Sequence, residues 1–139
     1  MVYWEKLGGS RVDDLLTILV VEDDPFIQLL VEDALTDGGF ELAIAVSGEE
    51  AVTLLKGNGV KYRVLITDIN LRGRLNGWEV AKQAREVDPA FPIIYLTGAA
   101  AEQWASNGVP KSALLPKPFA IAQLVTAVAQ LLNSTPLPT

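Results

Sequence analysis

The sequence predicts an α/β domain whose five parallel strands form one doubly wound sheet. Five short runs of aliphatic and β-branched residues alternate with stretches of helical periodicity along the chain. This alternation is typical of parallel strands joined by helical crossovers. Polar residues follow the ends of these runs, as Asp68 follows Val64 to Thr67. Because parallel strands end at the same edge of a sheet, we expect these polar side chains to lie close together.

The expected strands are short and mostly apolar, because a sheet with helices on both faces buries both sides of its strands. Right-handed crossovers would place the helices on the two faces and a ligand site at the carboxyl edge, where the strand order reverses. The five strands are expected at Ile18 to Val21, Glu41 to Val46, about Tyr62 to Thr67, about Ile93 to Leu96, and about Ala113 to Leu115.

Capping signals mark the first two helices. Asp24 can cap free amides and Pro25 fits the first helical position, so a helix is expected from there to about Asp37, where a glycine pair ends it. Residues Ser47 to Glu50 match a capping box, which predicts a second helix that ends near Gly57.

The remaining helices are predicted from periodicity and turn residues. A third helix is expected from about Gly77 to Val87, after a loop rich in Arg, Gly and Asn. The segment from Gly98 to Gly108 has room only for a short helix. Apolar residues at helical spacing predict a last helix within Phe119 to Leu132.

Composition bounds the class of protein. The chain has 139 residues, enough for one ordinary domain, and 17 acidic against 11 basic side chains give a net charge of −6. That charge disfavours direct binding to nucleic acids or anionic membranes. The absence of cysteine and histidine excludes thiolate metal sites, cysteine nucleophiles and imidazole catalysis. No apolar run approaches the roughly 20 residues of a membrane span, so we expect a cytoplasmic protein.

The polar strand ends predict a site for a divalent cation. If the strands that end at Val21 and Thr67 are neighbours, they lie about 4.8 Å apart, and carboxylates that follow them could share one Mg²⁺. We expect Asp23 and Asp68 to bridge this ion and Glu22 to act through a bound water. Two such carboxylates about 4 Å apart repel by about 4 kcal/mol at an effective dielectric near 20, so the site needs a cation.

Two further strand ends add an ammonium and a hydroxyl. Lys117 follows Leu114 to Pro116, and its charge would stabilise a phosphoryl group passing to an oxygen of Asp68. Thr97 closes the fourth strand, from which its hydroxyl could donate to a phosphoryl oxygen. The combination favours phosphoryl transfer assisted by a divalent cation.

Four segments in this order resemble the receiver domain of two-component response regulators. They are Val20 to Asp24, Leu65 to Asn70, Tyr95 to Gly98, and Pro116 to Phe119. The resemblance covers about Thr17 to Leu132 and implies a CheY-like, flavodoxin-like sandwich with strand order 2-1-3-4-5. It implies that Asp68 accepts a phosphoryl group from a histidine kinase or a histidine phosphotransfer protein. The chain would then be a signalling phosphoacceptor rather than an enzyme, apart from catalysing its own phosphotransfer and dephosphorylation.

The resemblance also assigns the metal ligands. It makes Asp23, Asp68 and the backbone carbonyl of Asn70 ligands of Mg²⁺, with Mn²⁺ as an alternative, and it makes Glu22 a support for the metal.

The other strand-end residues take switching roles by the same resemblance. Thr97 would act as the switch residue that responds when Asp68 is phosphorylated, and Lys117 would pair with the acyl phosphate. The resemblance also implies a cis peptide bond between Lys117 and Pro118. We expect a receiver domain over residues 17–132, an N-terminal extension over 1–16 and a flexible tail over 133–139. Because 139 residues leave no room for an output domain beside the receiver, we expect the signal to pass to a downstream protein target. A homodimer is left open.

Three departures from the family pattern limit this assignment. Arg72 stands where the family usually has proline, and Gly77 comes one position later than is common. Leu114 occupies a position that often holds a switching Tyr or Phe, so output must use other contacts. Only 19 residues lie between Thr97 and Lys117, which predicts a shortened fourth helix, as in a subgroup of stand-alone receivers.

Other functions fit parts of the pattern. A receiver-like interaction module that no longer uses phosphate is suggested by Leu114 and the altered loop. A phosphatase with an aspartyl-phosphate intermediate is the alternative from the enzyme class, but such enzymes usually carry a second acid where this chain has Asn70. A flavodoxin-like FMN protein is disfavoured because the loop after the first strand is acidic.

Overall fold

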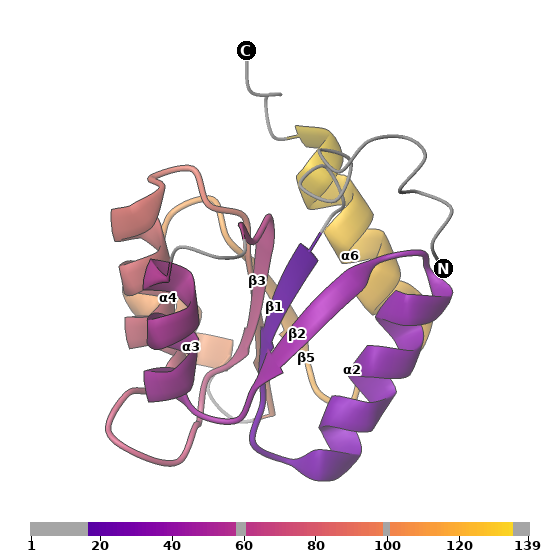
Figure 1. Ribbon diagram of the computed structural model, residues 1–139, viewed down its shortest axis with the longest axis horizontal. Coiled ribbons are helices and arrows are strands. Elements are labelled where there is room, and N and C mark those ends of the chain that lie inside the picture. Colours follow the sequence, from indigo (N-terminus) through magenta and orange to yellow (C-terminus); the bar gives the residue numbers. More distant parts are fainter. Residues whose placement is uncertain (1–16, 58–60, 99–100, 135–139) are drawn as a thin grey trace.

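The sheet has five parallel strands in the order β2-β1-β3-β4-β5, which confirms the predicted topology (Figure 1). The computed structural model describes residues 17–57, 61–98 and 101–134. β1 pairs with both β2 and β3, so the strand order reverses beside β1. The carboxyl end of β1 therefore lies at the point of the sheet where ligands bind in doubly wound folds. The strands are β1 Thr17–Val21, β2 Glu41–Ala45, β3 Val64–Asp68, β4 Ile93–Thr97 and β5 Ala113–Pro116.

Three strands, β3, β4 and β5, extend one residue further toward the carboxyl edge than the sequence predicted, and β5 ends at Pro116. Asp68 is the last residue of β3 and is in register with Leu96, and Thr97 is the last residue of β4 and is in register with Pro116. Both polar residues therefore belong to the ladder itself rather than to the following loops. Their backbone positions are consequently fixed by the sheet.

The second strand is one residue shorter than predicted. Val46 leaves the ladder after Ala45 because its amide donates to Oε1 of Glu50 in the next helix, at 2.7 Å. Ser47 accepts the amide of Glu50 at 3.1 Å, as the predicted capping box requires. The side chain of Glu50 thus accepts the amide of Val46, the residue before the N-cap Ser47, instead of the amide of Ser47 itself. This hydrogen bond ends β2 next to the start of the helix.

The helices agree with the sequence prediction in number and nearly in bounds. They are α2 Pro25–Asp37, α3 Gly48–Lys56, α4 Gly77–Val87, the 3₁₀ turn η2 Ala101–Gln103, α5 Trp104–Asn107 and α6 Ile121–Ser134. The last helix starts two residues later than Phe119, because the side chain of Gln123 caps the amide of Ala120 at 2.8 Å. Within the described residues, no helix is long and apolar enough to cross a membrane.

The helices cover both faces of the sheet and enclose two cores. α3 and α4 pack together on one face, and α2 and α6 pack together on the other (Figure 1). Alternate strand residues serve the two cores, so Leu19 and Leu65 point to the first while Ile18 and Ile66 point to the second. The expected extension over residues 1–16 and residues 135–139 of the expected tail lie outside the described residues, whereas residues 133–134 belong to α6 and not to a flexible tail.

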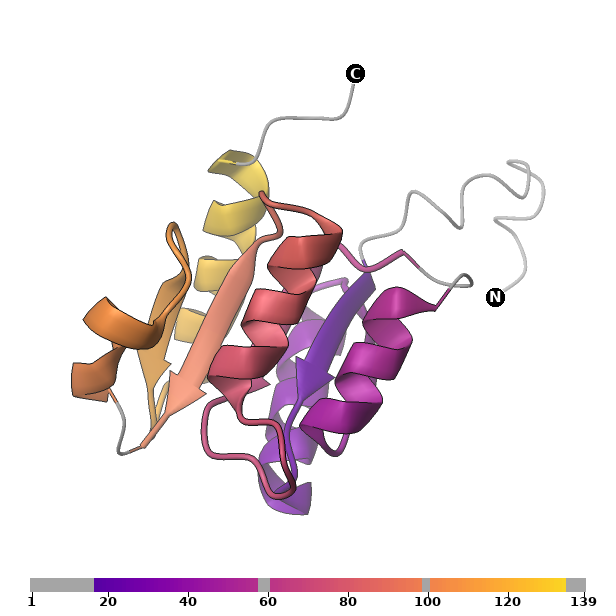
Figure 2. The same ribbon diagram turned by 90° about the vertical axis from the view of Figure 1, so that its left-hand side faces the viewer.

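A short crossover joins β4 to β5, as predicted, and Figure 2 shows it on the same side as α4. The indole nitrogen of Trp104 donates to Oγ of Ser112 at 3.0 Å. The hydroxyl of Tyr95, a fully buried residue of β4, accepts the amide of Val109 at 3.1 Å. Leu114 packs against the same core. Tyr95 therefore ties the sheet to the crossover.

Replacing Tyr95 with Phe should destabilise the protein by about 1–3 kcal/mol, because the buried amide of Val109 loses its acceptor. Urea unfolding measures this loss. Tyr62→Phe is the matched control, since the hydroxyl of Tyr62 has no hydrogen-bond partner among the described residues. Equal stability of Tyr95→Phe and wild type would contradict the role of this bond.

Candidate acidic site at the carboxyl edge

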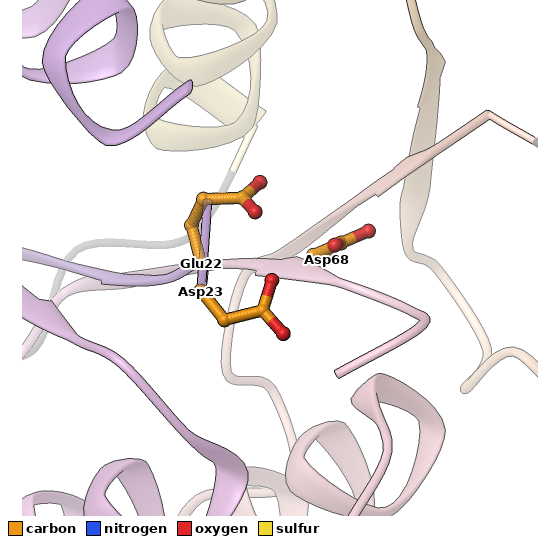
Figure 3. A group of neighbouring side chains, drawn as sticks. All are labelled: Glu22, Asp23 and Asp68. Atoms are coloured by element: carbon orange, nitrogen blue, oxygen red, sulfur yellow. The ribbon is translucent and has the colours of Figure 1, made fainter. Parts of the chain in front are cut away.

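Three carboxylates meet where β1 and β3 end. Glu22 and Asp23 follow β1, and Asp68 ends β3, the strand paired with β1. Each offers an oxygen atom, and these atoms lie within 4.8 Å of one another. Figure 3 shows Glu22 and Asp23 extending from the end of β1 toward the side on which Asp68 lies.

Glu22 is fully buried, and its carboxylate is held on both sides. Oε1 accepts Nζ of Lys117 at 3.1 Å, and Oε2 accepts the amide of Asp24 at 3.1 Å. Its own carbonyl accepts the side-chain amide of Gln28 at 2.7 Å. These contacts turn Glu22 toward Lys117, so its carboxylate is less free than that of Asp23 to take a further ligand.

Lys117 joins the acidic cluster from β5. Its backbone amide donates to the carbonyl of Thr97 at 2.7 Å, which places it directly after the sheet. Its ammonium lies 3.1 Å from Oε1 of Glu22 and 3.5 Å from Oδ2 of Asp68. The Lys117–Pro118 bond is cis, as the resemblance implied. One ammonium therefore bridges two of the three carboxylates.

Asp23 faces the loop between β3 and α4. Its Oδ2 accepts the amide of Arg72 at 3.0 Å, and Nε of Arg72 lies 3.8 Å from the same oxygen. The Arg72 side chain is 87% exposed, whereas that of Asp23 is 15% exposed. Solvent screens the guanidinium strongly, so the backbone amide is the firmer of the two contacts.

The loop returns to the sheet at Gly77. The amide of Gly77 donates to the carbonyl of Ile69 at 2.8 Å. A Cβ at Gly77 would fall on the carbonyl oxygen of Asp68, so only glycine permits this approach. Asn76 and Glu79 form a reciprocal capping box at the start of α4. Sequence analysis missed this box, although the Asn-x-x-Glu spacing was a readable signal.

Burial and charge act against each other on the ionisable groups. Burial raises the pKa of Asp68 above its ordinary 3.8, and the charge of Lys117 offsets this only in part. Burial, followed by the charge of Asp68, raises the pKa of Glu22 above its ordinary 4.5. Burial alone would lower the pKa of Lys117, but the charges of Asp68 and Glu22 outweigh it and raise that pKa.

The cluster suits a hard divalent cation. Three carboxylates lie together, and the one ammonium beside them, that of Lys117, contacts only Glu22 and Asp68. Burial raises the pKa of both these carboxyl groups, and the charge of Lys117 offsets this only in part. Oxygen donors are the ligands that Mg²⁺ and Mn²⁺ prefer. Asp23 and Asp68 would hold such an ion, with Glu22 beside it.

The structure brings Glu22, Asp23, Asp68 and Lys117 together, as the sequence analysis expected. Thr97 is buried at the end of β4, the neighbour of β3. Asn70 is exposed two residues after Asp68, and its role as a ligand stays a prediction. Glu49 was read only as part of a capping box, yet it also contacts the loop after Asp68. No local sequence signal indicates that contact.

A sequence profile of the response regulator receiver domain matches residues 18–129, so the chain belongs to that family. It is a receiver domain of two-component signalling systems with the CheY-like fold. Response regulator MprA of Mycobacterium sp. (strain KMS) is 32% identical over 120 residues, which cover 85% of this chain and 51% of that protein. The chain spans about half the length, or less, of the first curated relatives that it matches.

Solved structures show the same relationship. A response regulator receiver protein from Sinorhizobium medicae WSM419 is 47% identical with a TM-score of 0.84, covering 87% of this chain and 97% of that one. The receiver domain of sensor histidine kinase PA1611 from Pseudomonas aeruginosa PAO1 is 27% identical with a TM-score of 0.76, covering 86% and 99%. That structure has a magnesium ion coordinated in its active-site cleft.

Binding of Mg²⁺ should weaken on acidification while ordinary carboxylates are still ionised. Protons compete with the ion for Asp68 and Glu22, whose pKa values are raised. Calorimetric titration with Mg²⁺ at a series of pH values, from neutral down to the ordinary pKa values of 3.8 and 4.5, measures the effect. The expected result is an affinity for Mg²⁺ that already falls before the pH reaches these values. An affinity that begins to fall only below them would contradict the raised pKa values.

Proposed function

We propose that Asp68 accepts a phosphoryl group from the phosphohistidine of a histidine kinase or a histidine phosphotransfer protein. The observation that carries this proposal is the position of the Asp68 carboxylate close to the ammonium of Lys117 and to the carboxylates of Glu22 and Asp23. Its carboxylate lies 3.5 Å from Nζ of Lys117 on one side and beside Glu22 and Asp23 on the other. The residue is 7% exposed, so the reacting oxygen is desolvated yet reachable.

The transfer requires positioning and charge neutralisation more than covalent machinery. An oxygen of Asp68 attacks the phosphorus, the P–N bond to the donor imidazole breaks, and the imidazole leaves with a proton. Lys117 stabilises the charge that develops on the acyl phosphate. Mg²⁺, or Mn²⁺, held by Asp23, Asp68 and the Asn70 carbonyl with Glu22 in support, supplies further positive charge when bound.

The phosphoryl group carries about −1.5 to −2 charge. Because the acyl phosphate replaces a carboxylate of charge −1, the end of β3 becomes more negative by about 0.5 to 1. Thr97 lies one strand away and Lys117 two strands away, so both can respond to the new oxygens. Movement of these residues biases the face formed by β4, β5 and the elements that follow them. Because Leu114 replaces the usual aromatic residue, the output passes through other side chains of that face to a downstream protein.

The proposal extends to the remaining assignments, which membership of the family supports. The protein acts as a phosphoacceptor that catalyses its own phosphotransfer and dephosphorylation, in the cytoplasm, with residues 17–132 as the receiver. Leu114 also supports one competing function, an interaction module that does not use phosphate. Binding of beryllium fluoride that requires Mg²⁺ would exclude that alternative, because this phosphate mimic engages a competent aspartate. Failure of the protein to bind beryllium fluoride in the presence of Mg²⁺ would favour the phosphate-independent module.

Asp68→Asn should abolish phosphorylation, because the amide lacks the nucleophilic oxygen. Mass spectrometry after incubation with acetyl phosphate and Mg²⁺ is expected to show one added phosphoryl group on the wild-type chain and none on the variant. Asp33→Asn, at an exposed position of α2, is the control and should label like wild type. Undiminished labelling of Asp68→Asn would refute the assignment of the acceptor.

A further inference from the structure

Two carboxylates accept backbone amides of the loop between β3 and α4. Asp23, after β1, accepts the amide of Arg72 at 3.0 Å. Glu49, in the first turn of α3, accepts the amide of Arg74 at 3.0 Å. The two amides are separated only by Gly73. The backbone from Arg72 to Arg74 is therefore hydrogen-bonded both to the acidic cluster and to α3.

The Glu49 contact is closely fitted. Gly73 has a φ of +100°, and a Cβ there would lie 3.0 Å from Oε2 and 3.1 Å from Oε1 of Glu49. Oε1 is buried and has no hydrogen-bond partner among the described residues. The amide of Arg74, followed by those of Glu49 and Leu75, lowers the pKa of Glu49. The loop thus wraps a charged group with its backbone.

The base of this contact is rigid. α3 packs along α4, and a Cβ at Gly48 would lie 2.8 Å from the carbonyl oxygen of Leu75. Ser47 caps the helix just before Glu49. Glu49 therefore starts from a fixed backbone position that is already in contact with the loop. It can transmit that position to Arg74 and, two residues earlier, to Arg72.

We propose that Glu49 is a positioning residue for the cation site: it fixes the β3–α4 loop so that the Arg72 amide orients the Asp23 carboxylate. This role rests on the proposed function, because it requires that Asp23 binds the ion. The contacts use backbone amides, so neither arginine side chain is needed. The altered loop, with Arg72 in place of proline, supplies the amide that a proline could not.

The test compares Glu49→Ala and Glu49→Gln with wild type. Calorimetry gives the dissociation constant for Mg²⁺, ¹⁵N NMR gives the amide resonance of Arg72 without metal, and urea unfolding gives stability. Glu49→Ala should weaken Mg²⁺ binding by about tenfold, the low end for partners of metal ligands, and shift the Arg72 resonance. Glu49→Gln keeps an acceptor oxygen and should restore most of both. Glu86→Ala, an exposed acid in α4, controls for loss of charge.

Each outcome has a defined meaning. Unchanged Mg²⁺ affinity in a folded Glu49→Ala variant overturns the positioning role, as does a loss of affinity without a shift of the Arg72 resonance. Equal losses in Glu49→Gln and Glu49→Ala reduce the effect to charge and also overturn it. If Glu49→Ala does not fold, Glu49→Gln decides: an Mg²⁺ affinity and an Arg72 resonance near those of wild type agree with the positioning role, and a tenfold loss of affinity overturns it. A wild-type chain that binds no Mg²⁺ overturns the proposed cation site itself.

Discussion

Electrostatic repulsion at the carboxyl edge of the sheet is the constraint on which the rest of the site depends. The ladder between β1 and β3 brings three carboxylates within 4.8 Å, and the sheet offers them one ammonium, from Lys117. Desolvation keeps the pKa values of Glu22 and Asp68 raised despite that ammonium. Such a cluster is tolerable when a cation can enter between the carboxylates.

The sequence was sufficient for the fold because local and global signals agree. Apolar runs, capping residues and glycine pairs each predict the same alternation of strands and helices, and α2 and α4 have the predicted bounds. The acidic cluster could be predicted as well, because parallel strands must end at one edge. What failed were strand ends: Asp68 and Thr97 pair within the ladder, and Val46 leaves it for a helix cap, which depends on neighbours that a local pattern does not contain.

The loop after Asp68 shows the limit of sequence reasoning most clearly. Its contacts with Asp23 and Glu49 join residues that are 49 and 25 positions apart, and they use backbone amides, which every residue except proline has. A pattern of side chains in the sequence therefore cannot predict these hydrogen bonds. The sequence analysis gave Glu49 no role beyond its place within the capping box of Ser47 to Glu50. In the structure Glu50 makes the capping contact and Glu49 accepts an amide of the loop. The same geometry ties α3 to the acidic site.

The most direct test is a crystal structure of the protein with Mn²⁺, recorded at a wavelength where the ion scatters anomalously. The account predicts one anomalous peak between Asp23 and Asp68, and, with Mg²⁺, octahedral density with oxygen ligands at about 2.0–2.1 Å. An ion bound elsewhere, or these two carboxylates turned apart with no peak between them, would contradict it.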